Sequence, residues 1–228
     1  MAIHQACHPN KLLHDEKTEP HVKLEKGHDY LFALLSERNA NPDRANKIDR
    51  LLWEELGDQG AILATDSSGF TRITRKRGTL HFLSMIQKGF AMSLPIIKRE
   101  AGTLVKQEAD NILCTFPEPL NAMRAAEGIR KKLEAHNQSI EDSDSHIRYS
   151  FGIGYGSFLR FSHDIFGDEV NVASKLGEDT ATENTILVSK AAYGRLGEVP
   201  AQWSLTSPKI VSLGGTALEY REAAHQPK

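Results

Sequence analysis

Residues 60–71, GAILATDSSGFT, combine a short apolar run with a turn of small residues. The run AILAT is typical of a buried strand and ends at Asp66. The next residues, Ser67–Gly69, lead into the start of a helix. Free backbone N–H groups at a helix start favour a phosphate, although an ordinary Ser/Thr cap with a tight turn explains the same residues. The stretch therefore predicts a strand, a turn and a helix, with a candidate phosphate site at the turn.

The sequence that follows alternates between helical and strand patterns. A helix is predicted over residues 71–99, which Pro95 must bend or shorten. GTLVK (102–106) and NILCTF (111–116) predict two strands joined by the four residues QEAD, a length typical of a hairpin. An alanine-rich amphipathic helix follows, and then HIRYSFGIGYG (146–156) alternates apolar and polar positions, as a half-buried strand does. This order predicts an α+β fold, a ferredoxin-like split βαβ sheet with helices packed on it.

The C-terminal part extends this pattern. After Gly167 the sequence predicts a helix through EVNVASKLGED, a strand through TILVS and a short helix through KAAYGRL. Two more strands are expected around Gly214–Gly215. We therefore assign residues 57–224 to one α+β domain.

Residues 1–56 predict a polar tail and a short amphipathic helical segment in front of this domain. His4, Cys7 and His8 offer soft or borderline metal ligands. No second ligand cluster follows at zinc-site spacing, so a flexible tail is the simpler interpretation. The amphipathic helix that ends at Gly57 can pack on the domain that follows it or on a second copy of itself. The sequence allows both.

The composition is that of a globular chain of 228 residues. Hydrophobic residues make up 39% and charged residues 25%, which excludes a wholly disordered chain. Lysine and arginine number 28 against 30 aspartate and glutamate, so bulk charge does not favour nucleic acid or anionic lipid as a partner. The sequence shows neither an apolar run near the roughly 20 residues that span a bilayer nor a signal peptide. Cys7 and Cys114 form no disulfide framework, and we expect a cytoplasmic protein without membrane insertion.

Two carboxylates follow or precede predicted strands. Asp66 closes AILAT, and Asp110 lies in the hairpin turn before NILCTF. A strand and its neighbouring hairpin can bring these ends to one edge of the sheet. Two carboxylates there would bind Mg²⁺ and leave open positions for phosphate oxygens. Aspartate is also common in turns, so this pair alone is compatible with a purely structural role.

Four blocks occur in the order of a known family: TDSSGFT, GTLVKQEADNILCTF with its alanine-rich helix, HDIFGDEVNVASKL and TILVS. Together they resemble the class III nucleotidyl cyclase catalytic domain, from about Ala61 to Ser189 and more weakly to Tyr220. The separation of 44 positions from Asp66 to Asp110 fits the two metal-ligand aspartates of that family.

The resemblance implies a head-to-tail dimer in which each active site is shared between two chains. Asp66 and Asp110, assisted by the backbone carbonyl of Ser67, would hold two Mg²⁺ or Mn²⁺ ions per site. The nucleotide would lie against the turn and helix start, formed by Ser68, Gly69, Phe70 and Thr71.

The second chain would supply the purine and ribose contacts. Lys106 and Asp164 match the adenine-selecting positions, and a Lys donor with an Asp acceptor suits N1 and the 6-amino group of adenine. Asn171 matches the asparagine that orients the ribose, and Lys175 the arginine that meets transition-state charge. The structural alternatives are an exposed strand lysine, a turn aspartate and exposed helix residues.

The sequence departs from the family pattern at several positions. Lys175 keeps the charge of the usual arginine but loses the planar fork that grips phosphate. VSLGGTALEY contains no phosphate-binding lysine, and Lys209 lies several residues too early. Ala109 stands where glycine usually precedes the second aspartate, and SFLRFSH is about half as long as the same segment in many relatives. FGDE superficially resembles the diguanylate cyclase signature, but VNVASKL continues it as a helix.

The resemblance, with the metal and purine positions intact, implies an adenylate cyclase that converts ATP to 3′,5′-cyclic AMP and pyrophosphate by two-metal-ion catalysis. A homodimer is expected, because one chain carries both halves of the site. The alternatives are a non-catalytic or weakly active cyclase-like nucleotide-binding module, and a guanylate cyclase.

Overall fold

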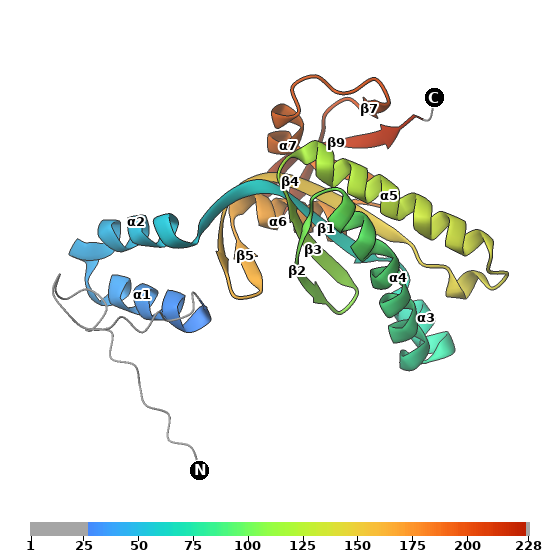
Figure 1. Cartoon of the computed structure of the whole chain (residues 1–228), viewed down its shortest axis with the longest axis horizontal. Coiled ribbons are helices and arrows are strands. Elements are labelled where there is room, and N and C mark those ends of the chain that lie inside the picture. Colours follow the sequence, from blue (N-terminus) through green and yellow to red (C-terminus); the bar gives the residue numbers. More distant parts are fainter. Residues whose placement is uncertain (1–26, 227–228) are drawn as a thin grey trace, which may run out of the picture. The chain divides into compact units, whose positions relative to one another are not determined.

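The computed structural model describes residues 27–226, with Phe70 and Leu213 described by their backbone alone. The histidine-rich tail with His4, Cys7 and His8 lies outside the described residues. The chain divides into two compact units (Figure 1). One comprises the chain up to Asp58 together with Leu159–Ile165, and the other comprises Gln59–Phe158 and the chain from Phe166 onward. Each unit is described by itself below.

The sheet contains nine strands in the described chain. Seven of them run in the order β2-β3-β1-β4-β6-β9-β7, while β5 pairs with β4 and β8 pairs with β9. Their bounds are β1 Gly57–Ser67, β2 Thr103–Glu108, β3 Asn111–Phe116, β4 Tyr149–Phe161, β5 Asp164–Phe166, β6 Ile186–Ser189, β7 Trp203–Leu205, β8 Lys209–Leu213 and β9 Thr216–His225. The hairpin β2–β3 is antiparallel, β3 is antiparallel to β1, and β4 is parallel to β6. The predicted α+β sheet with packed helices is confirmed.

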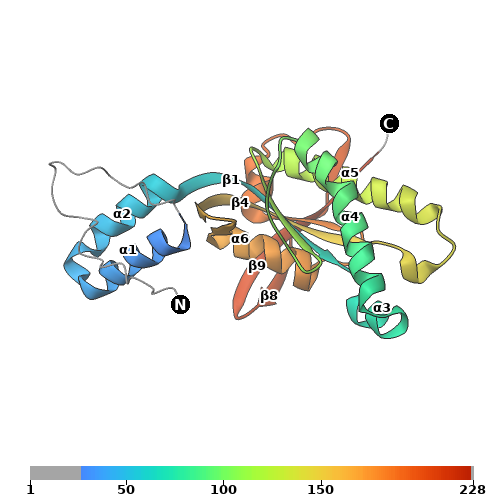
Figure 2. The ribbon, with the colours of Figure 1, turned by 60° about the horizontal axis from the view of Figure 1, so that its bottom comes forward.

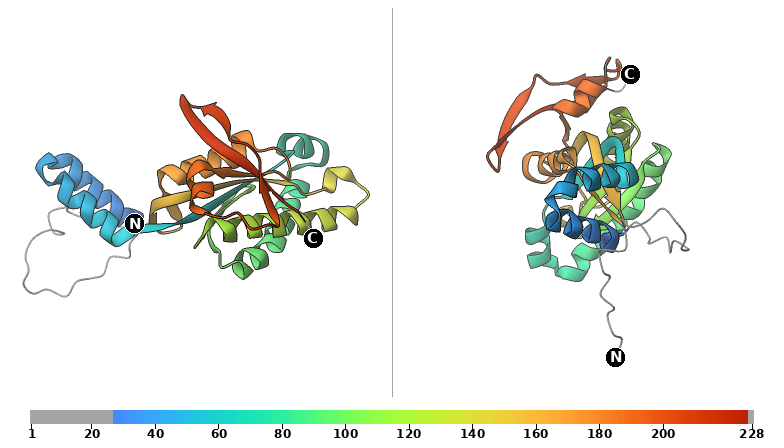
Figure 3. Two further views of the ribbon diagram at one scale, coloured as in Figure 1. Left: turned by 90° about the horizontal axis from the view of Figure 1, so that it is seen from above. Right: turned by 90° about the vertical axis from the view of Figure 1, so that its left-hand side faces the viewer.

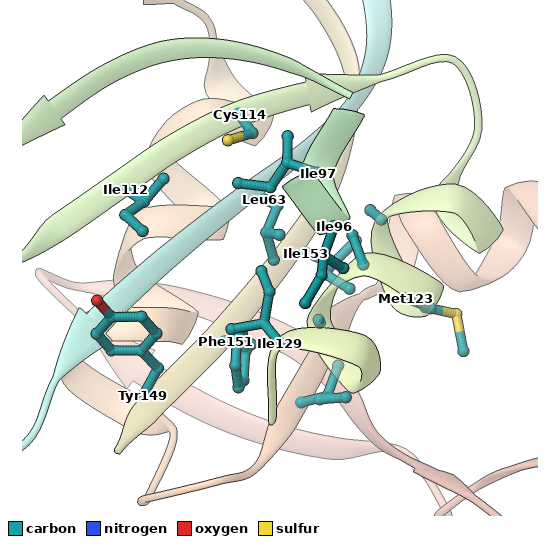
Figure 4. Close-up of a cluster of buried hydrophobic side chains, with 14 of the residues drawn as sticks. Leu63, Ile96, Ile97, Ile112, Cys114, Met123, Ile129, Tyr149, Phe151 and Ile153 are labelled. Atoms are coloured by element: carbon teal, nitrogen blue, oxygen red, sulfur yellow. The ribbon is translucent and has the colours of Figure 1, made fainter. Parts of the chain in front are cut away.

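Helices cover both faces of this sheet (Figure 3). On one face α4 (Thr79–Arg99) and α5 (Pro119–Gln138) pack together over a core that includes Leu63, Phe151 and Ile153 (Figure 4). On β6, Ile186 and Val188 belong to this core, whereas Leu187 between them packs with α6 (Asp168–Lys175). Since alternate residues of a strand point to opposite faces, α6 covers the other face. A short helix, α7 (Lys190–Arg195), follows β6 and contributes Ala192 to the first core.

This two-sided covering overturns one prediction. We expected residues 146–156 to form a half-buried strand, but β4 is buried at all of its first six residues. Three of the six alternating polar positions, at 152, 154 and 156, are glycines. At Gly152 a Cβ atom would stand 2.1 Å from the Ala173 carbonyl oxygen and 2.4 Å from the Gly177 nitrogen. The glycines therefore allow α6 and the π-helical segment Leu176–Thr180 to pack directly on the strand.

Two predicted element boundaries are wrong. The helix over residues 71–99 is two helices, α3 (Phe70–Arg77) and α4, and the break falls at Gly78, whose φ of 87° is left-handed. Helix α4 continues through Pro95. The β2–β3 connection has two residues instead of four, because pairing continues to Glu108 and Asn111. Among the described residues, α4 is the one helix that is long and apolar enough to cross a membrane, and its buried face belongs to the core that α5 also lines.

The other unit consists of a helical pair and one end of a strand hairpin. Helix α1 (His28–Ala40) is joined to α2 (Ala45–Leu56) by a 3₁₀ turn, Pro42–Arg44. The apolar face of α2 packs against α1 and against Phe161 from the end of β4. Arg38 on α1 also donates to Asp49 on α2, at 2.5 and 3.0 Å. The amphipathic helix therefore buries its face within its own chain.

Candidate active site

Asp66 and Asp110 meet where β1 runs antiparallel to β3. Thr65 pairs with Ile112, so Asp66 follows the last registered pair while Asp110 directly precedes β3. The Ile112 N–H donates to Thr65 Oγ1 at 3.2 Å, which fixes this end of the register. With its nitrogen turned toward β1, the Asn111 amide donates to Asp66 Oδ1 at 2.9 Å. The fold thus brings together the two aspartates that the sequence predicts as metal ligands.

The turn that carries Asp110 is strained. Ala109 has a φ of 50°, in the left-handed region that costs a non-glycine residue about 1 kcal/mol. The glycine usual at this position would adopt the same conformation at little cost. Pairing of Glu108 with Asn111 closes the two-residue turn and holds Ala109 in place. Strained backbone next to a candidate ligand is typical of functional sites.

Acidic side chains share this end of the sheet. Burial, followed by the charges of Asp110 and Glu178, raises the pKa of Asp66 to about 6. Burial also raises the pKa of Asp110. Raised pKa values mean that the carboxylate forms are disfavoured here as long as no cation is close. A bound cation would reverse this effect.

The donor set suits a hard divalent ion. Mg²⁺ is usually bound by one or two carboxylates together with substrate phosphates, and Mn²⁺ accepts the same oxygen ligands. Asp66, Asp110 and the carbonyl of Ser67, the last residue of β1, offer such a set. Within residues 27–226 no group of three or more His, Cys, Asp or Glu side chains is arranged to hold a metal. The oxygen donors of Asp66, Asp110 and Ser67 would therefore suit a divalent ion.

The turn after β1 presents the start of α3. Gly69 has a φ of 93°, a conformation that glycine adopts readily. From Phe70 onward, the first backbone N–H groups of α3 have no partner within the helix, and the Thr71 side chain is exposed. The Ser68 N–H donates to the carbonyl of Arg148 at 3.1 Å, which ties the turn to the residue before β4. The phosphate site at this helix start stays a prediction.

Two acidic residues near this site escaped the sequence prediction. Glu178 and Asp179 lie on the π-helical segment after α6. Burial, Asp179 and Asp110 raise the pKa of Glu178, while Lys106 lowers it. Their only sequence signal is two adjacent acids at the end of a predicted helix. They reach the end of the sheet that carries Asp66 and Asp110 because the glycines at positions 152 and 177 let this segment pack closely on β4.

The candidates for purine and ribose contact lie on three elements. Lys106 on β2 is half-buried and forms an ion pair with Glu108 at 3.2 Å. Asn171 is exposed on α6. Asp164 begins β5, where its Oδ1 accepts from the Ile165 N–H at 2.8 Å. Asp164 belongs to the unit of α1 and α2, whereas Lys106 and Asn171 belong to the other unit. Their roles stay predictions.

Residues 54–222 match the Adenylate and Guanylate cyclase catalytic domain family, and this stretch includes every predicted site residue. The chain belongs to this family. The predicted resemblance is therefore confirmed, and proteins of this family act on nucleotides.

Named relatives share part of the cyclase domain. The adenylate cyclase of Streptomyces coelicolor is 27% identical over 139 residues, which are 60% of this chain and 34% of that protein. A Rhizobium meliloti protein whose name contains adenylate cyclase is 29% identical over 117 residues, 51% of this chain and 20% of that protein. The crystal structure of an adenylate/guanylate cyclase/hydrolase from Silicibacter pomeroyi superposes with a TM-score of 0.64 at 24% identity, and the alignment covers 75% of this chain and 98% of that one. The match spans a fifth to a third of the two sequence relatives, and the structural match establishes the fold.

The cyclase domain carries a lysine beside its β8–β9 turn, although the turn itself has none. Lys175 is the last residue of α6, and its Nζ lies 3.5 Å from where a Cβ on Gly214 would stand. Lys209, the nearest lysine in the sequence, instead forms an ion pair with Glu222 at 3.3 Å. Lys175 thus places a positive charge next to the β8–β9 turn. Lys209 is instead paired with Glu222 on the neighbouring strand β9.

Proposed function

We propose that this chain is an adenylate cyclase that converts ATP to 3′,5′-cyclic AMP and pyrophosphate. The observation that carries the proposal is the pair Asp66 and Asp110 at one sheet edge, next to the free N-terminus of α3. Carboxylates for divalent ions and N–H groups for phosphate, placed side by side, suit a nucleoside triphosphate. Membership of the cyclase family supports cyclisation of a nucleoside triphosphate as the reaction.

Each residue has a defined task in this reaction. When bound, two Mg²⁺ or Mn²⁺ ions activate the ribose 3′-hydroxyl and stabilise charge on the α-phosphate. Asp66, Asp110 and the Ser67 carbonyl hold these ions, and residues 68–71 receive phosphate oxygens at the start of α3. Asn171 orients the ribose, so that the 3′-hydroxyl faces the α-phosphorus.

The site is proposed to be shared in a head-to-tail homodimer. One chain supplies the metal ligands, and a second chain supplies Lys106, Asp164, Asn171 and Lys175. This arrangement requires only one kind of chain, since each carries both sets.

Purine selectivity tests the proposed substrate. Lys106 donates and Asp164 accepts, which matches N1 and the 6-amino group of adenine and mismatches guanine. A buried polar group left unpaired costs about 1–3 kcal/mol, so we expect kcat/KM for ATP to exceed that for GTP by at least about 10-fold. Initial rates with Mn²⁺ and each nucleotide measure this ratio, and the Lys106→Ala variant should reduce it. Equal turnover of GTP would instead favour a guanylate or mixed cyclase.

A weakly active or non-catalytic module is the second candidate, because Lys175 replaces the arginine usual in the family. Arginine offers a planar fork to developing phosphate charge, whereas lysine offers a point charge. We therefore expect Lys175→Arg to raise kcat by up to about 10²-fold with little change in KM, and Lys175→Ala to lower kcat. Lys132→Arg, at an exposed lysine of α5, is the matched control and should change neither constant. If wild type, Lys175→Arg and the control all bind ATP without turnover, the non-catalytic module is the correct function.

A further inference from the structure

Helix α3 is short and contributes little of its own to fixing its position in the fold. It has eight residues, and isolated helices shorter than about 12 residues are marginal in water. Left-handed glycines border it on both sides, Gly69 with a φ of 93° and Gly78 with a φ of 87°. Among its described side chains, Ile73 is the one that is buried. The position of its N-terminus must therefore depend on contacts with other segments.

A short acidic segment supplies such contacts. Asp144 lies in a 3₁₀ turn, Ser143–Ser145, and its side chain is only 5% exposed. One of its oxygens pairs with Arg72 and the other with Lys76, so that it links two successive turns of α3. These ion pairs, that with Lys76 foremost, hold the pKa of Asp144 below its usual range. Figure 2 shows α3 at the start of the long helix α4.

Residues next to Asp144 add further contacts to α3 and to the turn before it. Asp142 accepts from Arg77 at 2.6 Å and from the Asp144 backbone N–H at 3.1 Å, so it holds both the helix and the acidic turn. The Ser68 N–H donates to the Arg148 carbonyl at 3.1 Å at the other end of α3. The segment 142–148 therefore contacts α3 through ion pairs of Asp142 and Asp144, and it contacts the turn before α3 through the Arg148 carbonyl.

We propose that Asp144 is a positioning residue that fixes the N-terminal turn of α3 for the triphosphate of the substrate. The inference rests on the proposed function, in which residues 68–71 receive phosphate oxygens. Asp144 lies on a different segment from α3 and acts through Arg72 and Lys76. Free N–H groups bind an anion well only if they are held in place beforehand, because ordering them on binding weakens affinity.

The test replaces Asp144 by asparagine, which removes the negative charge of the side chain and keeps its shape. We expect Asp144→Asn to raise KM for Mn²⁺-ATP about 10-fold, since the neutral amide loses the charge-assisted contacts with both cations while the exposure of these cations limits the loss. The affinity for inorganic tripolyphosphate, measured by calorimetry with Mn²⁺, should fall by a similar factor. kcat should change less than about 3-fold, because α3 contacts phosphate equally before and during the reaction. Asp144→Glu should restore most of both affinities.

Glu127→Gln is the matched control. Glu127 is also a nearly buried carboxylate, 7% exposed, and it pairs with two cations, Arg130 at 2.7 Å and Lys131 at 3.2 Å. It lies on α5, so its loss should lower stability without changing KM or tripolyphosphate affinity. If Asp144→Asn folds poorly, Lys76→Gln offers a second route, since Lys76 is 63% exposed and its loss should raise KM in the same direction.

The outcomes separate this inference from the proposed function. An Asp144→Asn protein whose KM and tripolyphosphate affinity stay within 2-fold of wild type overturns the positioning role, even where turnover of ATP supports the proposed cyclase. An equal rise of KM in Glu127→Gln also overturns it, because the effect would then be general destabilisation. A wild-type protein that binds neither Mn²⁺-ATP nor tripolyphosphate overturns the proposed function and this inference together.

Discussion

Replacing Asp66 by asparagine is expected to reduce cyclic AMP formation on the order of 10³-fold, because charge stabilisation by a metal contributes several kcal/mol to catalysis. Asp110→Asn should have a similar effect, since both carboxylates stand at the same end of β1 and β3. Product formation from Mn²⁺-ATP measures the loss. Near-normal turnover of either variant would show that the carboxylate is not a metal ligand.

The Asp66→Asn substitution should also stabilise the folded protein when no metal is bound. The folded-state pKa of Asp66, about 6, is above its unfolded value, so ionisation disfavours the fold. This penalty is complete above the folded pKa and absent below the unfolded one. At neutral pH we therefore expect Asp66→Asn to raise the free energy of unfolding by about 1 kcal/mol, a value reduced for partial solvent exposure. Near pH 4 the gain should vanish.

Urea denaturation in the presence of a chelator, at pH 7.5 and pH 4, measures this difference. Glu141→Gln, at an exposed carboxylate, is the control and should leave the unfolding free energy unchanged at both pH values. A destabilised Asp66→Asn protein at pH 7.5 would mean that the aspartate has a structural role that outweighs its unfavourable charge.

Mixing two variants that are damaged in different halves of the site is expected to restore activity beyond that of either variant alone. In a shared head-to-tail site, Asp66→Asn removes the metal half and Lys106→Ala removes the purine half. A heterodimer of the two chains has one doubly damaged site and one intact site. With random pairing half of the dimers are mixed, so an equimolar mixture should recover about a quarter of wild-type activity.

The control for this experiment mixes Asp66→Asn with Asp110→Asn. Both changes damage the metal half, so every dimer then has two defective sites and activity should stay absent. Mixed dimers that form, as shown by differently tagged chains, but do not recover activity would contradict a shared site.

Much of the candidate site could be predicted from local sequence. AILAT followed by Asp66 specifies a buried strand with a carboxylate at its end, because apolar β-forming residues and a small-residue turn act over only a few positions. The four blocks and their order specify the family, and the fold follows from it. The left-handed Gly69 belongs to the same local information, since few residues other than glycine adopt that conformation.

Other features depended on contacts between distant segments. Pro95 is the stronger helix breaker in isolation, yet the break falls at Gly78 and α4 runs through Pro95. The residues after this proline, Ile96 and Ile97, are buried in the core with α5, and this packing favours the continued helix. The half-buried pattern of β4 was misleading for a similar reason. In the sequence pattern its glycines count as polar, solvent-facing positions. In the structure they are the positions where α6 packs closely on the strand.

Only the tertiary structure decided which charges surround the candidate ligands. Glu178 joins Asp66 and Asp110 through the packing of the π-helical segment, and Asp144 meets α3 across 72 positions of sequence. Asp164 belongs to the same structural unit as α1 and α2, and Phe161, three residues before it, is buried in the core of that unit. Local sequence fixes where strands, turns and ligands begin, since these depend on backbone preferences of neighbouring residues. Burial and electrostatic coupling depend on residues far apart in the chain, and they are defined only once the sheet has brought those residues together.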